Sequence, residues 1–173
     1  MLVNLSDVLT SEGKVEKITV ALEMTEFSAG LGNFSVTEKS PVEFSFTNIG
    51  VGKAKVEGNV NITFATECDR CLTEVPTILE LQFDRVVTAP DVTEDEDDER
   101  PDYMEGYQLD VEAFVYSEIL INWPVKILCK EDCKGVCLKC GQNLNMRECG
   151  CDTFVPDPRM AVLKDIFNAN KEV

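Results

Sequence analysis

Eight cysteines in three closely spaced groups restrict the fold of this chain more than any other feature. The groups are Cys68-x2-Cys71, Cys129-x3-Cys133 and Cys137-x2-Cys140-x8-Cys149-x-Cys151. Eight thiolates are the number that two tetrahedral four-cysteine sites require, and short spacings of this kind are typical of structural zinc. We therefore predict two zinc ions, each held by four of these cysteines.

The order of the cysteines indicates how they divide between the two sites. The last group resembles a zinc ribbon, because backbone N–H groups can point at the sulfurs of its Cys-x2-Cys-Gly turn and Gly141 accepts a positive φ. Cys68 and Cys71 supply only two of the four ligands that a site needs. Cys129 and Cys133 are the remaining pair and are predicted to supply the other two. An exchange of roles among Cys129, Cys133 and Cys137 stays open.

Three other uses of the cysteines are open alternatives. Disulfides need an oxidising compartment, and we expect a cytoplasmic protein because the N-terminal residues lack the pattern of a secretory signal. A redox pair at Cys68 and Cys71 would need a helix N-terminus to lower a thiol pKa, whereas both follow a predicted strand. An iron–sulfur cluster could also take all-cysteine ligation.

The remaining composition argues against catalysis and favours a basic partner. The chain has no histidine, which removes Ser-His-Asp and Cys-His nucleophiles, and closed four-cysteine sites leave no coordination position for a substrate. Its formal charge of −16 disfavours non-specific binding to polyanions, and two tetrathiolate zinc sites would lower the total to about −20. We predict a protein that is not an enzyme and that binds a positively charged partner.

Alternation with a period of two residues predicts strands in the first half of the chain. Apolar side chains occupy one face of each predicted strand: Ile18, Val20 and Leu22; Val42, Phe44 and Phe46; Val56, Val60, Ile62 and Phe64; Val75, Leu79, Leu81 and Phe83. The glycine-rich segment 48–52 predicts a hairpin turn, and the first Cys-x2-Cys lies at the tip of the next hairpin. We predict an α+β fold, a mostly antiparallel curled sheet or partial barrel covered by one or two helices, with a small zinc-ribbon-like segment near the C-terminus.

Two helices are expected to cover this sheet. Asp110 is a suitable N-cap for a helix with an apolar face that ends before Pro124, and Trp123 is expected in the core. Asp157 and Pro158 predict the start of a second helix. We divide the chain into residues 1–128, the sheet and its cover helix, and residues 129–173, the zinc-binding segment and C-terminal helix, packed as one unit. Residues 91–105 carry a net charge of −8 and predict a solvated loop.

One segment departs from the acidic average and supports a second hypothesis. Residues 126–151 have a net charge of +2, contributed by Lys126, Lys130, Lys134, Lys139 and Arg147. Zinc ribbons can present basic residues to nucleic acid, so direct binding of rRNA through this segment is an alternative function. A thiol redox or metal-handling role of the first Cys-x2-Cys pair is another.

Several motifs together resemble the YceD family, in the cysteine-rich form found in Gram-positive bacteria. In chain order they are Cys68-Asp-Arg-Cys71-Leu after a strand, the acidic loop, Trp123-Pro124, the cysteines from Cys129 to Cys140 followed by Gly-Gln-Asn-Leu-Asn, Cys149-Gly-Cys151, and Asp157-Pro-Arg159. Members of that family are linked to the accumulation of large-subunit rRNA, and their genes often adjoin the gene for a small basic ribosomal protein. The resemblance implies a ribosome-biogenesis factor that binds a basic large-subunit ribosomal protein or a pre-ribosomal particle, with rRNA contact possible and no membrane or small-molecule substrate.

Overall fold

The fold was analysed in a computed structural model that describes residues 1–30, 32–92 and 101–151. The strands are β1 (Leu2–Asn4), β2 (Val15–Val20), β3 (Glu26–Ala29), β4 (Gly32–Lys39), β5 (Val42–Gly50), β6 (Lys53–Glu67), β7 (Glu74–Thr88), β8 (Met104–Glu105) and β9 (Gln108–Asp110). The helices are α1 (Ser6–Thr10) and α2 (Val111–Asn122). The predicted C-terminal helix from Asp157 lies outside the described residues.

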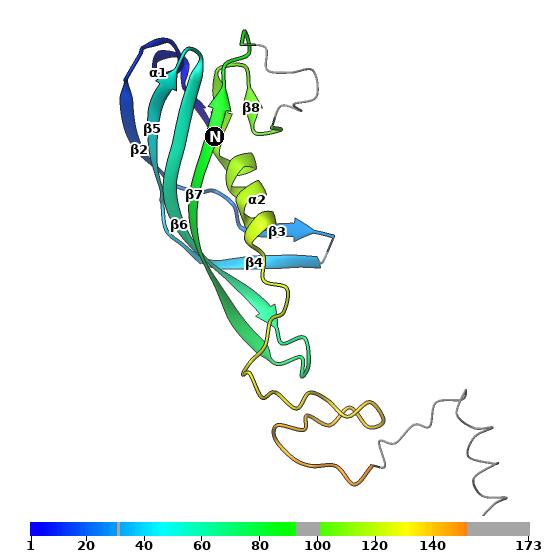
Figure 1. Cartoon of the computed structure of the whole chain (residues 1–173). Helices are drawn as coiled ribbons and strands as arrows, with labels where there is room; N and C mark the ends of the chain where they lie inside the picture. Colours follow the sequence, from blue (N-terminus) through cyan, green and yellow to red (C-terminus); the bar gives the residue numbers. More distant parts are fainter. Residues whose placement is uncertain (31, 93–100, 152–173) are drawn as a thin grey trace, which may run out of the picture.

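Over the residues that the structure describes, the main sheet consists of six antiparallel strands in the order β2-β5-β6-β4-β3, and β7 pairs with β6 as well. Strand β7 pairs with β6 along its full length, and the other side of β6 pairs with β5 over its first half and with β4 over its second half. In turn, β2 pairs with β5 and β3 pairs with β4. Figure 1 shows the β3–β4 hairpin turned sharply away from β2 and β5, so the sheet is strongly bent.

The break between β4 and β5 is caused by Pro41, which has no N–H to donate to the ladder. At this point the Ser40 N–H donates to the Asn61 carbonyl (2.8 Å), and the Asn61 N–H donates to the Ser40 hydroxyl (3.0 Å). The Ser40 hydroxyl thus accepts the hydrogen bond of the Asn61 N–H beside the break. The bend turns the β3–β4 hairpin toward the end of the sheet that carries the first cysteines.

Helix α2 packs across the bent sheet and completes the core. The Asp110 carboxylate accepts hydrogen bonds from the Glu112 and Ala113 N–H groups, so Asp110 is the predicted N-cap, and the helix ends at Asn122 before Trp123-Pro124. Aromatic rings form two clusters beneath it. One contains Phe44, Phe46, Phe83, Tyr103 and Phe114, and the other contains Phe27, Phe34, Phe64, Tyr116 and Trp123.

The predicted mostly antiparallel sheet covered by helices is confirmed, and the strands do not close into a barrel within the described residues. Two details differ from the prediction. A separate three-stranded sheet, β1-β9-β8, forms beside the main one, so residues 104 and 105 are strand rather than acidic loop. Asn48 belongs to β5 rather than to the turn, because its buried amide donates to the Val8 carbonyl at 2.8 Å and holds α1 on the sheet. No helix in the described part of the chain is long and apolar enough to span a membrane.

Gly58 in β6 is the position where an added methyl group is expected to be least tolerated. The Phe83 ring lies over this glycine, so a Cβ would lie 2.7 Å from the ring and would also collide with the Glu43 carbonyl oxygen. Overpacking against backbone cannot relax easily, and we expect Gly58→Ala to lower the free energy of unfolding by about 3 kcal/mol, measured by urea denaturation. Gly30→Ala is the control, since nothing lies within 4 Å of its Cβ position. Equal unfolding midpoints for the two variants would contradict the packing argument.

Candidate metal centres

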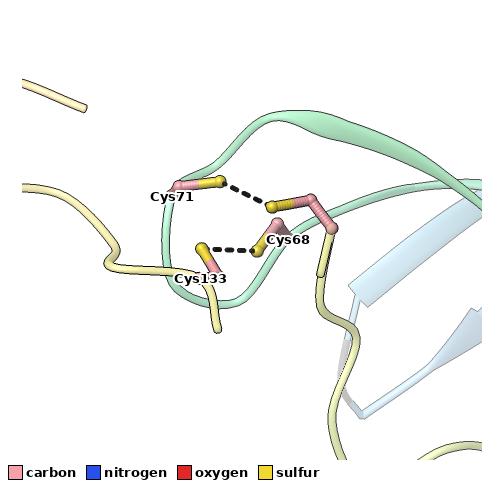
Figure 2. Close-up of side chains that lie close together, drawn as sticks. Cys68, Cys71 and Cys133 are labelled. Carbon is pink, nitrogen blue, oxygen red and sulfur yellow. Dashed lines mark hydrogen bonds between the residues drawn. The ribbon is translucent and has the colours of Figure 1, made fainter. Parts of the chain in front are cut away.

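Four sulfurs gather where the β6–β7 hairpin meets the segment after α2. The Sγ atoms of Cys68, Cys71, Cys129 and Cys133 all lie within 4.8 Å of one another. Two Sγ–Sγ distances are 3.8 Å (Cys68–Cys133) and 3.5 Å (Cys71–Cys129), and Figure 2 shows sulfurs of the hairpin turn and of the later segment pointing toward one another. Tetrahedral ligation with metal–sulfur bonds of about 2.3 Å requires sulfurs about 3.8 Å apart. The four side chains therefore fit a metal ion.

The second quartet consists of Cys137, Cys140, Cys149 and Cys151, whose Sγ atoms also lie within 4.8 Å of one another. The structure thus brings the cysteines together in the two groups that chain order favoured. The ribbon part of the prediction is not confirmed, because the described residues from 129 to 151 contain one isolated β-bridge, Val136 to Asn143, and no strand.

The two Cys-x2-Cys turns have the same backbone hydrogen bonds. In the first turn, the Leu72 N–H donates to the Cys68 carbonyl (2.9 Å) and the Cys68 N–H donates to the Thr73 carbonyl (2.8 Å). In the second, the Gly141 N–H donates to the Cys137 carbonyl (2.8 Å) and the Cys137 N–H to the Gln142 carbonyl (2.9 Å). Both turns are therefore knuckles built on one backbone pattern, although they share little sequence beyond the two cysteines.

The residue after the second cysteine of each knuckle has a positive φ. Gly141, with φ 71°, adopts this conformation as the sequence predicted, because glycine has no Cβ to clash. In the first knuckle the same place is taken by Leu72 with φ 57°, which is the one non-glycine residue with positive φ among the described residues. A left-handed conformation costs a side-chain-bearing residue about 1 to 2 kcal/mol, so the first knuckle keeps its leucine at a cost.

Backbone and side-chain hydrogen bonds join the first knuckle to the chain that follows α2. The Asp69 N–H donates to the Ile127 carbonyl, and the Ile127 N–H donates to the Asp69 carboxylate (2.8 and 2.7 Å). The Arg70 guanidinium donates to the Cys133 carbonyl (2.9 Å), while the Val136 N–H donates to the Arg70 carbonyl (3.0 Å). The two residues between the first cysteines therefore hold the second pair in position, a role that the sequence analysis did not assign to them.

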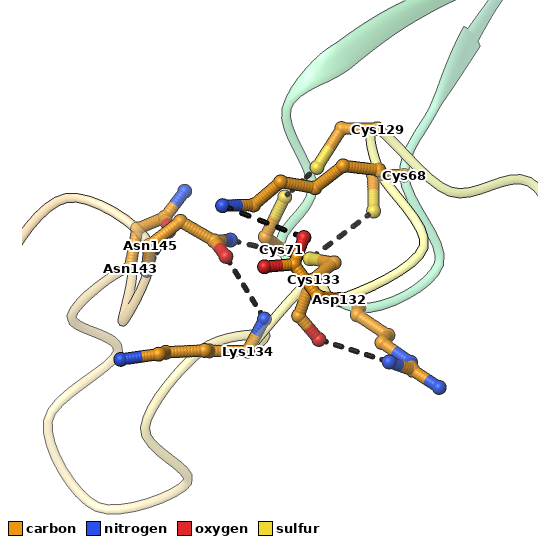
Figure 3. A network of polar contacts seen from close by, with 10 residues as sticks. Cys68, Cys71, Cys129, Asp132, Cys133, Lys134, Asn143 and Asn145 are labelled. Carbon is orange, nitrogen blue, oxygen red and sulfur yellow. Dashed lines mark hydrogen bonds and ion pairs between the residues drawn. The ribbon is translucent and has the colours of Figure 1, made fainter.

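Asparagine and threonine side chains surround the sulfurs of the first centre. Asn145 Nδ2 donates to Cys133 Sγ (3.2 Å), and its Oδ1 accepts from the Lys134 N–H (2.9 Å), as the network in Figure 3 shows. The Cys71 Sγ lies 3.3 Å from the Thr73 hydroxyl. Hydrogen bonds to coordinating sulfurs orient the ligands and reduce their negative charge. These outer residues were missed because they lie at no fixed spacing from the cysteines.

The thiol pKa values within each quartet diverge. Burial would raise the pKa of Cys68, yet the N–H groups of Cys129, Arg70 and Cys71 point at its sulfur and lower this pKa to about 6. Burial and the neighbouring sulfurs instead raise the pKa of Cys129 to about 12. Some cysteines of the site are therefore favoured as thiolates. The close approach of the four sulfurs disfavours four thiolates when no cation lies between them. A bound divalent cation would relieve that repulsion.

The second quartet has the same division. The N–H groups of Cys140 and Lys139 lower the pKa of Cys137 to about 6, whereas the neighbouring Cys140 sulfur and burial raise the pKa of Cys151 to about 12. In this group, however, Cys137 is the one buried cysteine. The second centre therefore has the chemistry of the first but is more open to solvent.

This difference in exposure predicts the order of metal loss. Three of the four cysteines of the first centre are buried, while Cys140 is exposed and Cys149 and Cys151 are partly exposed. When metal-loaded protein is treated with excess chelator, we expect two phases of metal release of equal amplitude, followed with a metallochromic dye. The fast phase should be missing in a Cys140→Ser variant. Loss of the slow phase from that variant would contradict the assignment.

The five basic residues singled out in the sequence are all exposed: Lys126, Lys130, Lys134, Lys139 and Arg147. Two of them lie near carboxylates, with Lys130 Nζ 3.8 Å from Asp132 and Lys134 Nζ 3.7 Å from Glu148. Surface pairs of this kind are weak and are broken easily by a stronger anion. The cysteine-rich segment therefore presents cations that are partly neutralised by its own acidic residues.

Comparison with known proteins places these features in a family. A model of the family described as "Large ribosomal RNA subunit accumulation protein YceD" matches residues 56–167, which span β6, β7, α2 and both cysteine quartets. No solved structure matches the chain.

Two curated proteins are similar over part of the chain. "Large ribosomal RNA subunit accumulation protein YCED homolog 1, chloroplastic" of Arabidopsis thaliana is 36% identical over 44 residues, which cover 25% of this chain and 14% of the relative. "Uncharacterized protein ML1660" of Mycobacterium leprae is 29% identical over 93 residues, or 51% of this chain and 42% of the relative. The matches thus span less than half the length of either relative. Because the family model covers well over half of the residues and includes the first knuckle and α2, this chain belongs to the YceD family.

Proposed function

We propose that this protein is a non-enzymatic ribosome-biogenesis factor that supports the accumulation of large-subunit rRNA. The observation that carries the proposal is the family match over residues 56–167, the part of the chain that contains most of β6, all of β7, the cover helix and both cysteine quartets. The partner that we propose is a basic large-subunit ribosomal protein, free or within a pre-ribosomal particle, in the cytoplasm. A formal charge of −16 supports a positively charged partner.

We further propose that zinc occupies both centres and acts structurally. Four sulfurs per group, sulfur separations near those of a tetrahedral site, and knuckles with N–H groups aimed at sulfur support this choice of metal. Metal analysis of purified protein tests it, with two zinc ions per chain as the expected result. Iron together with acid-labile sulfide would instead indicate an iron–sulfur cluster.

A native pull-down from the source cell extract tests the partner. Tagged protein is recovered from nuclease-treated and untreated halves of one extract, and the co-purifying species are identified. We expect a basic large-subunit protein in both halves, and its affinity should fall steeply between low and high salt because opposite charges attract it. Loss of all ribosomal proteins after nuclease treatment, or an affinity that does not change with salt, would contradict the proposal.

Direct rRNA binding through the cysteine-rich segment is the second candidate, and it is supported by the exposure of the five basic residues there. Reversing the charges of Lys130, Lys134 and Lys139 together should then abolish recovery of rRNA, while both metal ions are retained. A control variant with Lys17, Lys39 and Lys53 reversed, three lysines of the main sheet, accounts for the change in net charge. Unchanged rRNA recovery in the first variant would rule out this segment as the contact.

A further inference from the structure

A groove with a volume of about 510 Å³ lies between the first knuckle, the β3–β4 hairpin and the segment that follows α2. Its apolar lining comes from Phe34, Leu72, Trp123, Pro124 and Val125. Two of these side chains are largely open to solvent, since Leu72 is 65% exposed and Val125 is 97% exposed. The groove therefore offers apolar surface from three parts of the chain that are far apart in sequence.

Neither the backbone conformation at Leu72 nor the packing of the core favours a leucine at this position. Its backbone has the positive φ that the second knuckle satisfies with glycine, so glycine would relieve the strain at this position. Its side chain contributes little to the core, because most of it is exposed. An apolar side chain that is held in solvent by a strained backbone, at the edge of a groove, is a feature of binding sites rather than of packing.

The charged residues that line the groove are all acidic: Glu67, Asp69 and Glu74. Glu67 and Glu74 are directly opposite each other in the β6–β7 ladder. Like charges at opposed positions of an antiparallel pair are destabilising, so this end of the hairpin is less stable than it could be. A cation placed between the two carboxylates would remove the repulsion, which indicates the charge of the occupant.

The groove is held in shape by its neighbours. Asp69 and Ile127 exchange two hydrogen bonds, and these fix the segment after α2 to the knuckle. Trp123 packs against Phe27 and Phe34, with ring centroids 5.1 and 4.6 Å apart. Cys68, a member of the first metal centre, also lines the groove. A preformed site of this kind loses little conformational freedom on binding.

We propose that this groove binds an extended segment of a basic protein in which an aliphatic or aromatic side chain adjoins Lys or Arg. The apolar side chain lies against Leu72, Trp123 and Val125, and the cation lies between Glu67 and Glu74. This inference rests on the proposed function for the basic nature of the partner, and it adds the surface and the form of the segment recognised.

A random peptide display library, selected on immobilised full-length metal-loaded protein, provides the test. We expect the enriched peptides to combine an apolar residue with neighbouring Lys or Arg. The best tryptophan-free peptide is then synthesised as the probe. Its binding is measured from the emission of Trp123, which is the single tryptophan of the chain and lines the groove.

Two variants separate binding from folding. Leu72→Gly removes the apolar side chain and relieves the backbone, so it should weaken the peptide about tenfold while the protein melts at an equal or higher temperature. Glu67→Gln with Glu74→Gln should weaken it about tenfold at low salt, with the difference lost at high salt, and should likewise not lower the melting temperature. There are two matched controls, and both should leave the affinity for the peptide unchanged. One is Leu138→Gly, at a residue of the second knuckle that is 96% exposed. The other is the double variant Glu43→Gln with Glu80→Gln.

The outcomes distinguish this inference from the proposed function. It is overturned if no peptide is enriched, if the enriched peptides lack Lys and Arg, or if Leu72→Gly binds the probe as tightly as the parent. A concentration-dependent dimer that Leu72→Gly abolishes would also overturn it, because the groove would then hold a second copy. If the pull-down finds no ribosomal partner but the selection succeeds, the proposed function fails and the groove stands. If a ribosomal partner is found and binds the Leu72→Gly variant normally, the proposed function stands and the inference about the groove fails.

Discussion

Replacing Cys133 with serine is expected to reduce the metal content from two ions to one and to free the cysteine-rich segment from the β6–β7 hairpin. Cys133 is 3% exposed and its Sγ lies 3.8 Å from that of Cys68. Structural zinc sites contribute about 10 to 16 kcal/mol to the folding of small domains, far more than the few hydrogen bonds that join Asp69 and Arg70 to this segment. The main sheet should survive, because its aromatic core lies elsewhere in the fold.

Metal analysis and hydrogen exchange measure the effect of this substitution. Amide protection should fall sharply for residues 68–73 and 127–136 and should persist in the middle of β6 and β7. Cys149→Ser is the matched control, since it also removes one ion but belongs to the second quartet. It should leave the protection of residues 68–73 unchanged. Equal loss of protection at the hairpin tip in both variants would contradict the assignment of Cys133 to the first centre.

Replacing Glu118 with alanine is expected to destabilise the sheet and helix body about as strongly as Gly58→Ala. Glu118 is 3% exposed on the inner face of α2, and its carboxylate accepts two hydrogen bonds from the Arg85 guanidinium, at 2.7 and 3.1 Å. Removing one member of a buried ion pair leaves the other charge without its partner, which costs about 3 to 5 kcal/mol. Because the Arg85 side chain is 39% exposed, water can reach it, and we expect about 3 kcal/mol, at the lower end of that range.

Urea denaturation of five proteins separates the pair from simple packing. They are the parent, Glu118→Ala, Glu118→Leu, Arg85→Met, and the double variant Arg85→Met with Glu118→Leu. The double variant should regain most of the lost stability, because two apolar side chains of similar size leave no unpaired charge under α2. If the double variant is as unstable as the sum of the single changes, the ion pair does not account for the loss.

The long hairpin of β6 and β7 was predictable because one face of it is buried. Val56, Val60, Ile62 and Phe64 occupy alternate positions and are 0–1% exposed, so the period of the apolar residues matches the pleat of the strand. The helix α2 was predictable for a similar reason, since Asp110 caps it and Pro124 follows its end. Such signals act between residues that are close in the chain.

The β3–β4 hairpin and the small β1-β9-β8 sheet were not predicted. Strand β3 has four residues and β1 has three, too few for a period to be recognised against turns and loops. Asn48 was assigned to a turn because the segment 48–52 is rich in glycine, but the Asn48 amide is used inside the fold to hold α1. In each case a contact with a distant segment outweighs the local preference.

The candidate site likewise has features that the sequence predicted and features that it did not. The number of cysteines predicts two four-sulfur groups, and the glycine after Cys140 predicts the positive φ that is observed. The equivalent conformation at Leu72 could not be predicted, because leucine rarely adopts it. The hydrogen bonds from Asn145 to the Cys133 sulfur and from Ile127 to the Asp69 carboxylate join residues 12 and 58 positions apart, which no spacing rule connects.

By itself the sequence determined the alternating strands β2, β5, β6 and β7, the two groups of four cysteines and the net charge of −16. These properties follow from the period of apolar residues, the stoichiometry of tetrahedral ligation and the count of ionised groups. The tertiary structure alone decided that the β3–β4 hairpin, Trp123 and Leu72 surround one groove. The physical reason is that Pro41 bends the sheet and the first quartet joins the hairpin tip to the chain after α2, so surfaces that are remote in sequence become one.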